Sequence, residues 1–296
     1  MLVLDIQNLA KKYGSITAVN DLNLKVNKGE IFGILGPNGS GKTTTLGVIL
    51  GIIKANKGSY SWFEGKYGND ERLHIGALLE TPNFYPFLSA YRNLEIIAHI
   101  KRTTSPKIDD LLTLVNLTDR KDSSFRTFSF GMKQRLAIAA AMVGDPEVLI
   151  FDEPTNGLDP QGITEVREIV TRIAHHGKTV IMASHILDEV EKVCSHVAII
   201  KKGRLLGTGA VGAILGKDKQ VEIASDNLDK LREILANVSG VKILEQKNKH
   251  LVLSAAEDLS AAALNKLVFE KGLVLTHLVM RPKSLESEFL EITNRP

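Results

Sequence analysis

The sequence predicts an α/β fold: a mainly parallel sheet with an added antiparallel part, followed by a small α+β domain. Short apolar runs such as 147–151 alternate with helix-like segments through residues 1 to about 208, which is typical of a parallel sheet covered by helices. A glycine-rich break at 203–216 ends this pattern. Beyond it, the segments follow the order strand, helix, two strands, helix, strand.

The elements of the first part are predicted from apolar periodicity and from turn residues. The strand candidates are Leu2–Leu9, Leu22–Val26, Ile31–Leu35, Gly58–Phe63, Val148–Phe151, Thr179–Ala183 and His196–Lys201. The helix candidates are Thr43–Ile53, Ala90–Lys101, Pro106–Val115, Met132–Val143, Pro160–His175 and Ile186–Lys192. The earliest strands are hairpin-like, and they suggest the antiparallel part.

The second part has its own alternating pattern, with Asp226 and Asn227 as cap candidates for its first helix. The predicted elements are Gln220–Ala224, Leu228–Asn237, the hairpin Val241–Gln246 with His250–Ser254, Leu259–Lys271 and Leu273–Met280. This order favours a ferredoxin-like domain over an irregular cap on the first part. A last amphipathic helix is expected over Ser284–Ile292.

Composition excludes several classes of protein. The 296 residues carry 37 basic and 34 acidic side chains, so the net charge of +3 gives no support for a nucleic-acid-binding arm. Cys194 is the only cysteine, which suits a reducing cytosol. The start, 1–5, does not resemble a signal peptide, and apolar runs such as 44–53 are too short to span a bilayer. A membrane function would require another chain.

A glycine-rich loop between a buried strand and a helix predicts nucleotide binding. The loop consists of Gly36, Pro37, Asn38, Gly39, Ser40, Gly41, Lys42 and Thr43, and Thr44 follows in the helix. Glycines let successive amide N–H groups converge on phosphate oxygens, and the helix N-terminus adds a partial positive charge. Lys42 can neutralise the β- and γ-phosphates, and the Thr43 hydroxyl can ligate Mg²⁺. The alternative is a glycine-rich turn that only begins a helix.

Two adjacent carboxylates end a second apolar strand. Asp152 is placed at the carboxyl edge of the sheet, where ligands of open α/β sheets bind, and can hold Mg²⁺ through a water. Glu153 can serve as general base for an attacking water. His185 follows another apolar strand and can bond the γ-phosphate or that water, although a histidine there is often structural. In the loop 155–160, Gly157 indicates a turn and Pro160 a helix start.

With these motifs in place, residues 1–208 resemble the ATP-binding subunits of ABC transporters. The motifs that carry the resemblance are the loop 36–43, the segment 128–134, the strand 148–153, the loop 156–160 and His185. The resemblance implies a P-loop NTPase cassette with a helical subdomain at about 82–145, a linker at 209–216 and an accessory domain at 217–296.

The resemblance also assigns further nucleotide contacts. It implies that Ser129, Gly131 and Met132 clamp the γ-phosphate of ATP bound to the opposite subunit, and it places Asp159 among the nucleotide-binding residues. The family usually has glycine in place of Phe130 and glutamine in place of Met132, which leaves the geometry at these two positions open. Tyr13 matches the aromatic residue that stacks on adenine; an ordinary edge-strand tyrosine is the alternative.

One departure points to a branch of the family. After the strand His74–Leu79 the family normally has a glutamine, and this chain has Glu80, which we expect near the metal. Glu80 and the segment 129–134 look like the bacitracin-resistance and lantibiotic-immunity branch. The resemblance implies an ATP- and Mg²⁺-dependent dimeric motor that drives a separate permease from the cytoplasmic face of the membrane, exporting antimicrobial peptides or other amphiphiles.

Two other functions compete with this one. A soluble ATPase of the same superfamily would act on ribosomes or DNA, but the single phosphate loop and the short stretch from Thr43 to Ser129 disfavour it. A nucleotide kinase or a GTPase would leave the segment 128–134, Asp159 and His185 unexplained.

Overall fold

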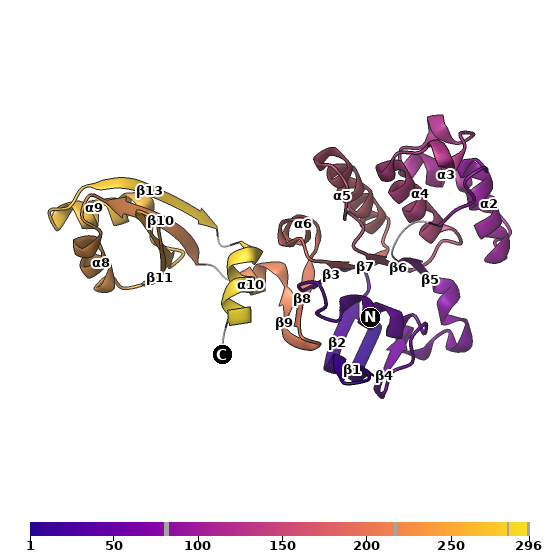
Figure 1. Cartoon of the computed structure of the whole chain (residues 1–296), viewed down its shortest axis with the longest axis horizontal. Coiled ribbons are helices and arrows are strands. Elements are labelled where there is room, and N and C mark those ends of the chain that lie inside the picture. Colours follow the sequence, from indigo (N-terminus) through magenta and orange to yellow (C-terminus); the bar gives the residue numbers. More distant parts are fainter. Residues whose placement is uncertain (80–82, 216–217, 283, 295–296) are drawn as a thin grey trace. The chain divides into compact units, whose positions relative to one another are not determined.

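The computed structural model describes residues 1–79, 83–215, 218–282 and 284–294. These residues divide into two compact units, 1–211 and 212–296 (Figure 1). The predicted metal ligand Glu80 lies outside the described residues. In the part of the chain that is described, no helix is long and apolar enough to cross a membrane.

A six-stranded sheet forms the centre of the first unit. Its strand order is β5 (Ile75–Leu78), β6 (Val148–Asp152), β7 (Thr179–Ser184), β3 (Ile31–Leu35), β8 (His196–Lys201) and β9 (Arg204–Ala210). The first five strands are parallel, and β9 pairs antiparallel with β8. Every residue of β6 and β7 is buried, as expected for strands covered on both faces.

A second sheet supplies the predicted antiparallel part. Its order is β2 (Ile16–Asn27), β1 (Leu2–Tyr13) and β4 (Lys57–Trp62). Side chains of this sheet share one hydrophobic core with the central sheet, in which Trp62, Phe63 and Ile34 are almost completely buried. Short 3₁₀ turns lie at Phe63–Gly65, Gly68–His74, Thr118–Arg120 and Phe125–Thr127.

The helices of the first unit fall into two groups. Helix α1 (Lys42–Ile49) follows the glycine-rich loop, whereas α5 (Pro160–His175) and α6 (Leu187–Val193) lie on the side of the central sheet away from β1, β2 and β4 (Figure 1). Three further helices pack mainly on one another and form a helical subdomain; they are α2 (Ala90–Ile100), α3 (Ile108–Leu114) and α4 (Phe130–Met142).

The second unit is an antiparallel sheet with two helices, in the split βαβ order that the sequence predicts. The strand order is β11 (Val241–Lys247), β12 (His250–Ala255), β10 (Lys219–Ser225) and β13 (Leu275–Pro282). Helices α8 (Leu228–Ala236) and α9 (Ala261–Glu270) supply Leu231, Leu235 and Leu264 to its core. The short helix α7 (Val211–Leu215) precedes this sheet, and α10 (Leu285–Asn294) follows it.

The structure corrects three boundaries. The glycine-rich stretch 203–216 is not simply a break, because 204–210 form the edge strand β9. Helix α1 ends at Ile49 instead of Ile53, since Gly51 takes a left-handed conformation (φ 68°) and the amides of Ile52 and Ile53 turn back to the Gly47 carbonyl. Helix α4 begins at Phe130, two residues before the predicted start, because Ser129 caps it.

Candidate functional site

The carboxyl ends of three adjacent strands bring the main predicted residues together. β6, β7 and β3 are neighbours, and they are followed by Glu153, by His185 and by the glycine-rich loop 36–41. In the ladder Asp152 lies beside Ala183, and Leu35 lies beside Ser184, so the three strands end at one edge. The predicted site therefore occupies the carboxyl edge of the sheet.

The glycine-rich loop is a backbone cradle that admits no side chains at two positions. Gly41 has φ 107°, and a Cβ there would overlap the Ala18 carbonyl oxygen. A Cβ on Gly36 would overlap the Ile200 carbonyl oxygen. Both positions need glycine, which lets the backbone curl tightly ahead of α1. The two supporting carbonyls carry no sequence signal, because nothing local links Ala18 or Ile200 to the loop.

This cradle fits a phosphate group. α1 starts at Lys42 directly after the loop, so the first-turn amides lack partners within the helix and carry the positive end of its dipole. Ser40 is 2% exposed, and among the described residues its Oγ has no hydrogen-bond partner. A buried hydroxyl in this position can donate to a phosphate oxygen. Pro37, Asn38 and Gly39 are exposed at the tip.

Lys42 connects the loop to the carboxylates. Its side chain is 5% exposed, and Nζ donates to the Gly36 carbonyl at 2.8 Å. The same ammonium lies 3.2 Å from Glu153 Oε1. One cation thus faces both the phosphate cradle and the predicted base.

Glu153 is held in a specific orientation. Its backbone has φ 49°, a left-handed conformation that costs a non-glycine residue about 1–2 kcal/mol. The Glu153 amide donates to the Ala183 carbonyl at 2.9 Å, and Oε2 lies 2.7 Å from His185 Nδ1. Strain at a residue fixed from several sides is typical of functional sites.

The carboxylate of Asp152 and the hydroxyl of Thr43 are suitable ligands for a magnesium ion. Asp152 is 5% exposed at the end of β6, and Thr43 is exposed in the first turn of α1. In the described ranges, no group of three or more His, Cys, Asp or Glu could hold a metal by itself. Mg²⁺ usually takes one or two carboxylates and completes its shell with water and substrate phosphates, so this sparse donor set suits Mg²⁺ bound with a nucleotide.

The segment 129–132 and Asp159 make local contacts. Ser129 Oγ accepts the Met132 amide at 3.3 Å, and Asp159 Oδ1 accepts the Gly162 amide at 2.8 Å, so each residue caps a helix. Ser129 is exposed and Gly131 is half-buried. Among the described residues of a single chain, none of these residues forms a hydrogen bond with the phosphate loop 36–43.

Tyr13 ends β1 with 46% of its surface exposed, and Lys11 Nζ lies 5.0 Å above its ring. A half-exposed aromatic ring of this kind can stack on a base.

A buried acid behind the site was missed from the sequence. Glu189 on α6 is 5% exposed and accepts a hydrogen bond from Thr155 Oγ1. Burial raises the pKa of its carboxyl above the ordinary value; the Thr155 hydrogen bond opposes this shift, and the charges of Asp188 and Glu153 add to it. An acid four residues after a histidine on a surface helix gives no sequence signal of burial.

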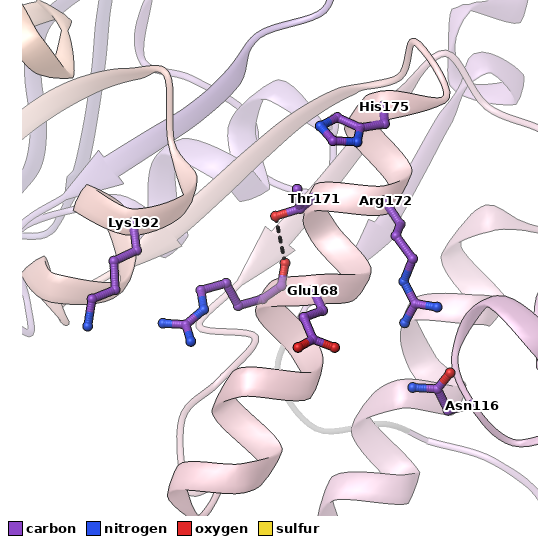
Figure 2. Close-up of a pocket in the computed structure, with 7 residues that line it drawn as sticks. Asn116, Glu168, Thr171, Arg172, His175 and Lys192 are labelled. Atoms are coloured by element: carbon purple, nitrogen blue, oxygen red, sulfur yellow. Dashed lines mark hydrogen bonds between the residues drawn. The ribbon is translucent and has the colours of Figure 1, made fainter.

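A hollow of about 750 Å³ lies along α5, away from the residues of the predicted nucleotide site (Figure 2). Arg172, Lys192 and His175 line it together with the acidic Glu168. None of the residues predicted for the nucleotide site lines this hollow. Its size therefore does not make it the site of the chemistry.

Comparison with known proteins decides the family. The family profile described as "ABC transporter" matches residues 19–156. The bacitracin transport ATP-binding protein BcrA of Bacillus licheniformis is 36% identical over 98% of this chain and 97% of its own length. The chain belongs to the ATP-binding subunits of ABC transporters. Members of this family hydrolyse ATP and work with separate permease subunits, so this chain is an ABC-type ATPase subunit.

Further similarities agree with this membership. The lantibiotic transport ATP-binding protein SrtF of Streptococcus pyogenes is 40% identical over 69% of this chain and 89% of its own length. A solved dimeric ATP-binding cassette in a post-hydrolysis state, bound to ADP and phosphate, matches with a TM-score of 0.62 and 25% identity. It covers 71% of this chain and 99% of its own. The predicted fold and the predicted family are confirmed.

Proposed function

We propose that this ATPase subunit powers an exporter of antimicrobial peptides or similar amphiphiles, with Glu153 as the base that activates water. The observation that carries the proposal is the chain of contacts from Lys42 to Glu153 (3.2 Å) and from Glu153 to His185 (2.7 Å) at the edge of the sheet. The relatives named for bacitracin and lantibiotic transport support the exported class.

Each part of the site then has a task. The amides of the loop 36–44, Ser40 Oγ and Lys42 Nζ bind the phosphates, and the half-exposed ring of Tyr13 stacks on adenine. Asp152 and Thr43 would hold Mg²⁺, which supplies charge neutralisation on the phosphate oxygens. Glu153 accepts a proton from the attacking water. His185 orients Glu153 through the bond to Oε2.

A second copy of the chain completes the site. Ser129 and Gly131 open α4 and are accessible at the surface, so the start of α4 can face the γ-phosphate bound to another protomer. Phe130, 43% exposed, rests against Gly157, which places the segment 129–131 beside the loop that follows Glu153. A homodimer would thus contain two equivalent sites.

The permease contact is proposed for the helical subdomain. Tyr85, Phe87 and Ile100 there are 61%, 77% and 75% exposed. Tyr85 and Phe87 precede α2 and Ile100 ends it, and contacts between proteins commonly cover exposed apolar side chains of this size. A cytoplasmic loop of the permease would cover them and hold the subunit at the inner face of the membrane.

Co-expression with a candidate permease tests this function. We expect the chain to join the membrane fraction only when the permease is present, and resistance to the exported peptide to need both chains. Absence of the chain from the membrane fraction when the permease is present, or full ATP turnover with no effect on export, would favour a soluble ATPase. A Phe87→Ser variant should weaken the association. Phe269→Ser is its control, because Phe269 is also exposed (67%) and lies in the second unit.

A further inference from the structure

The side chain of Glu189 joins the two segments that carry Glu153 and His185. Glu189 lies on α6, four residues after His185, and Thr155 lies two residues after Glu153. The Thr155 hydroxyl donates to Glu189 Oε2, and both side chains are at least 95% buried. The segments after β6 and β7 are therefore tied twice, once by Glu153 with His185 and once by Thr155 with Glu189.

The buried carboxylate of Glu189 has few hydrogen-bond partners. Among the described residues, Glu189 Oε1 has no hydrogen-bond partner. A cavity of about 10 Å³ adjoins it, lined otherwise mostly by apolar side chains such as Ile163, Val166 and Met182. Burying a carboxylate with one direct partner destabilises a fold, and an apolar side chain would pack there at lower cost. A stabilising role alone does not explain an acid at this position.

The placement of Glu189 beside the loop that follows Glu153 accounts for an acid at this position. Glu153 has a left-handed backbone, so the direction of its side chain depends on how the following loop is held. Thr155 lies in that loop, and its only side-chain hydrogen bond in the described part of the chain goes to Glu189. The bond between Thr155 and Glu189 therefore adds a second side-chain contact between the two segments and restricts the loop on which the direction of Glu153 depends.

We propose that Glu189 is a positioning residue for ATP hydrolysis, which through Thr155 holds the Glu153–His185 pair in its reactive orientation. The inference rests on the proposed role of Glu153 as the base. Glu189 itself does not contact the nucleotide.

The first test compares Glu189→Leu, Glu189→Gln and the control Asp188→Asn. Asp188 lies on the same helix, is 70% exposed and pairs with Lys192 at the surface. Glu189→Leu should lower kcat by roughly 10- to 100-fold with little change in KM for ATP, because small displacements of a catalytic group cost about this much. Glu189→Gln keeps an oxygen for Thr155 and should recover part of the loss. Asp188→Asn should behave as the parent. Unchanged kcat in Glu189→Leu would overturn the proposal.

A second test separates positioning from a general structural role. In a Glu153→Gln background there is no carboxylate base to orient, so adding Glu189→Leu should not slow the residual single-turnover hydrolysis further. An equal further loss in both backgrounds would overturn the proposal. Should Glu189→Leu fail to fold, Thr155→Val, which deletes only the donor hydroxyl, replaces it with the same expected result. If Glu153→Gln alone keeps the parental rate, the proposed function fails, independently of Glu189.

Discussion

Lys42 Nζ lies 3.2 Å from Glu153 Oε1, and the lysine side chain is 95% buried. Lys42 begins α1 after β3, and Glu153 directly follows β6, 111 positions later in the sequence. This ion pair joins the phosphate-binding loop to the proposed base, and it means that the cation facing the phosphates also neutralises the carboxylate beside them. Substitutions at the two positions should nevertheless have different effects, because one residue binds the nucleotide and the other activates water.

Lys42→Ala should weaken nucleotide binding by roughly 10- to 100-fold, since it removes a charged donor at the β- and γ-phosphates. Titration with a fluorescent ATP analogue measures this directly. Lys54→Ala removes the same charge from an exposed position and should bind as the parent does. Equal affinity of Lys42→Ala and the parent would remove the loop 36–43 from the binding site.

Gly41→Ala should abolish ATP binding and destabilise the fold. The added Cβ would overlap the Ala18 carbonyl, and φ 107° is unfavourable for alanine, which together cost at least about 1–3 kcal/mol. Gly212→Ala adds a methyl group in open space and is the control. Thermal unfolding with and without ATP checks both; a Gly41→Ala protein as stable as the parent and still stabilised by ATP would contradict this geometry.

Cys194 should be inert in the folded protein. Burial raises the pKa of its thiol from 9.0 to about 12, so very little reactive thiolate forms near neutral pH. Because the folded state disfavours the thiolate, the contribution of Cys194 to the free energy of unfolding should be constant below pH 9 and fall as the pH rises from 9 toward 12. Thiol labelling at pH 8 should proceed only at the rate of opening; rapid labelling of the native protein would show that the thiol is accessible.

A fragment ending at Val211 should fold and bind ATP. The described residues of the nucleotide site all lie in the unit 1–211, and the second unit has its own core. We expect the fragment to keep its ATP affinity and to lose dimer stability or coupling to the permease. An insoluble fragment without ATP affinity would show that the second unit is needed to fold the first.

The parts of the fold that sequence reasoning placed well have strong local signals. Helix α5 runs from Pro160 to His175 as predicted, because Asp159 caps it and proline suits its first position. Strand β9 lacked such a signal: its glycines suggested a break, and only its pairing with β8 makes it a strand. At the site, the glycine-rich loop and the pair Asp152–Glu153 also have local sequence signals and were predicted correctly as neighbours of the sheet edge. The tie between Thr155 and Glu189 depends on helix packing that no local pattern encodes.

The most direct measurement is the rate of ATP hydrolysis by Glu153→Gln, with ATP affinity measured on the same preparation. The variant keeps the shape of the side chain and an oxygen facing His185 but cannot take a proton from water. It should bind ATP as the parent does, hydrolyse it roughly 10²- to 10⁴-fold more slowly and accumulate an ATP-bound dimer. Hydrolysis at the parental rate would contradict the assignment of Glu153 as the base, and with it the proposed mechanism.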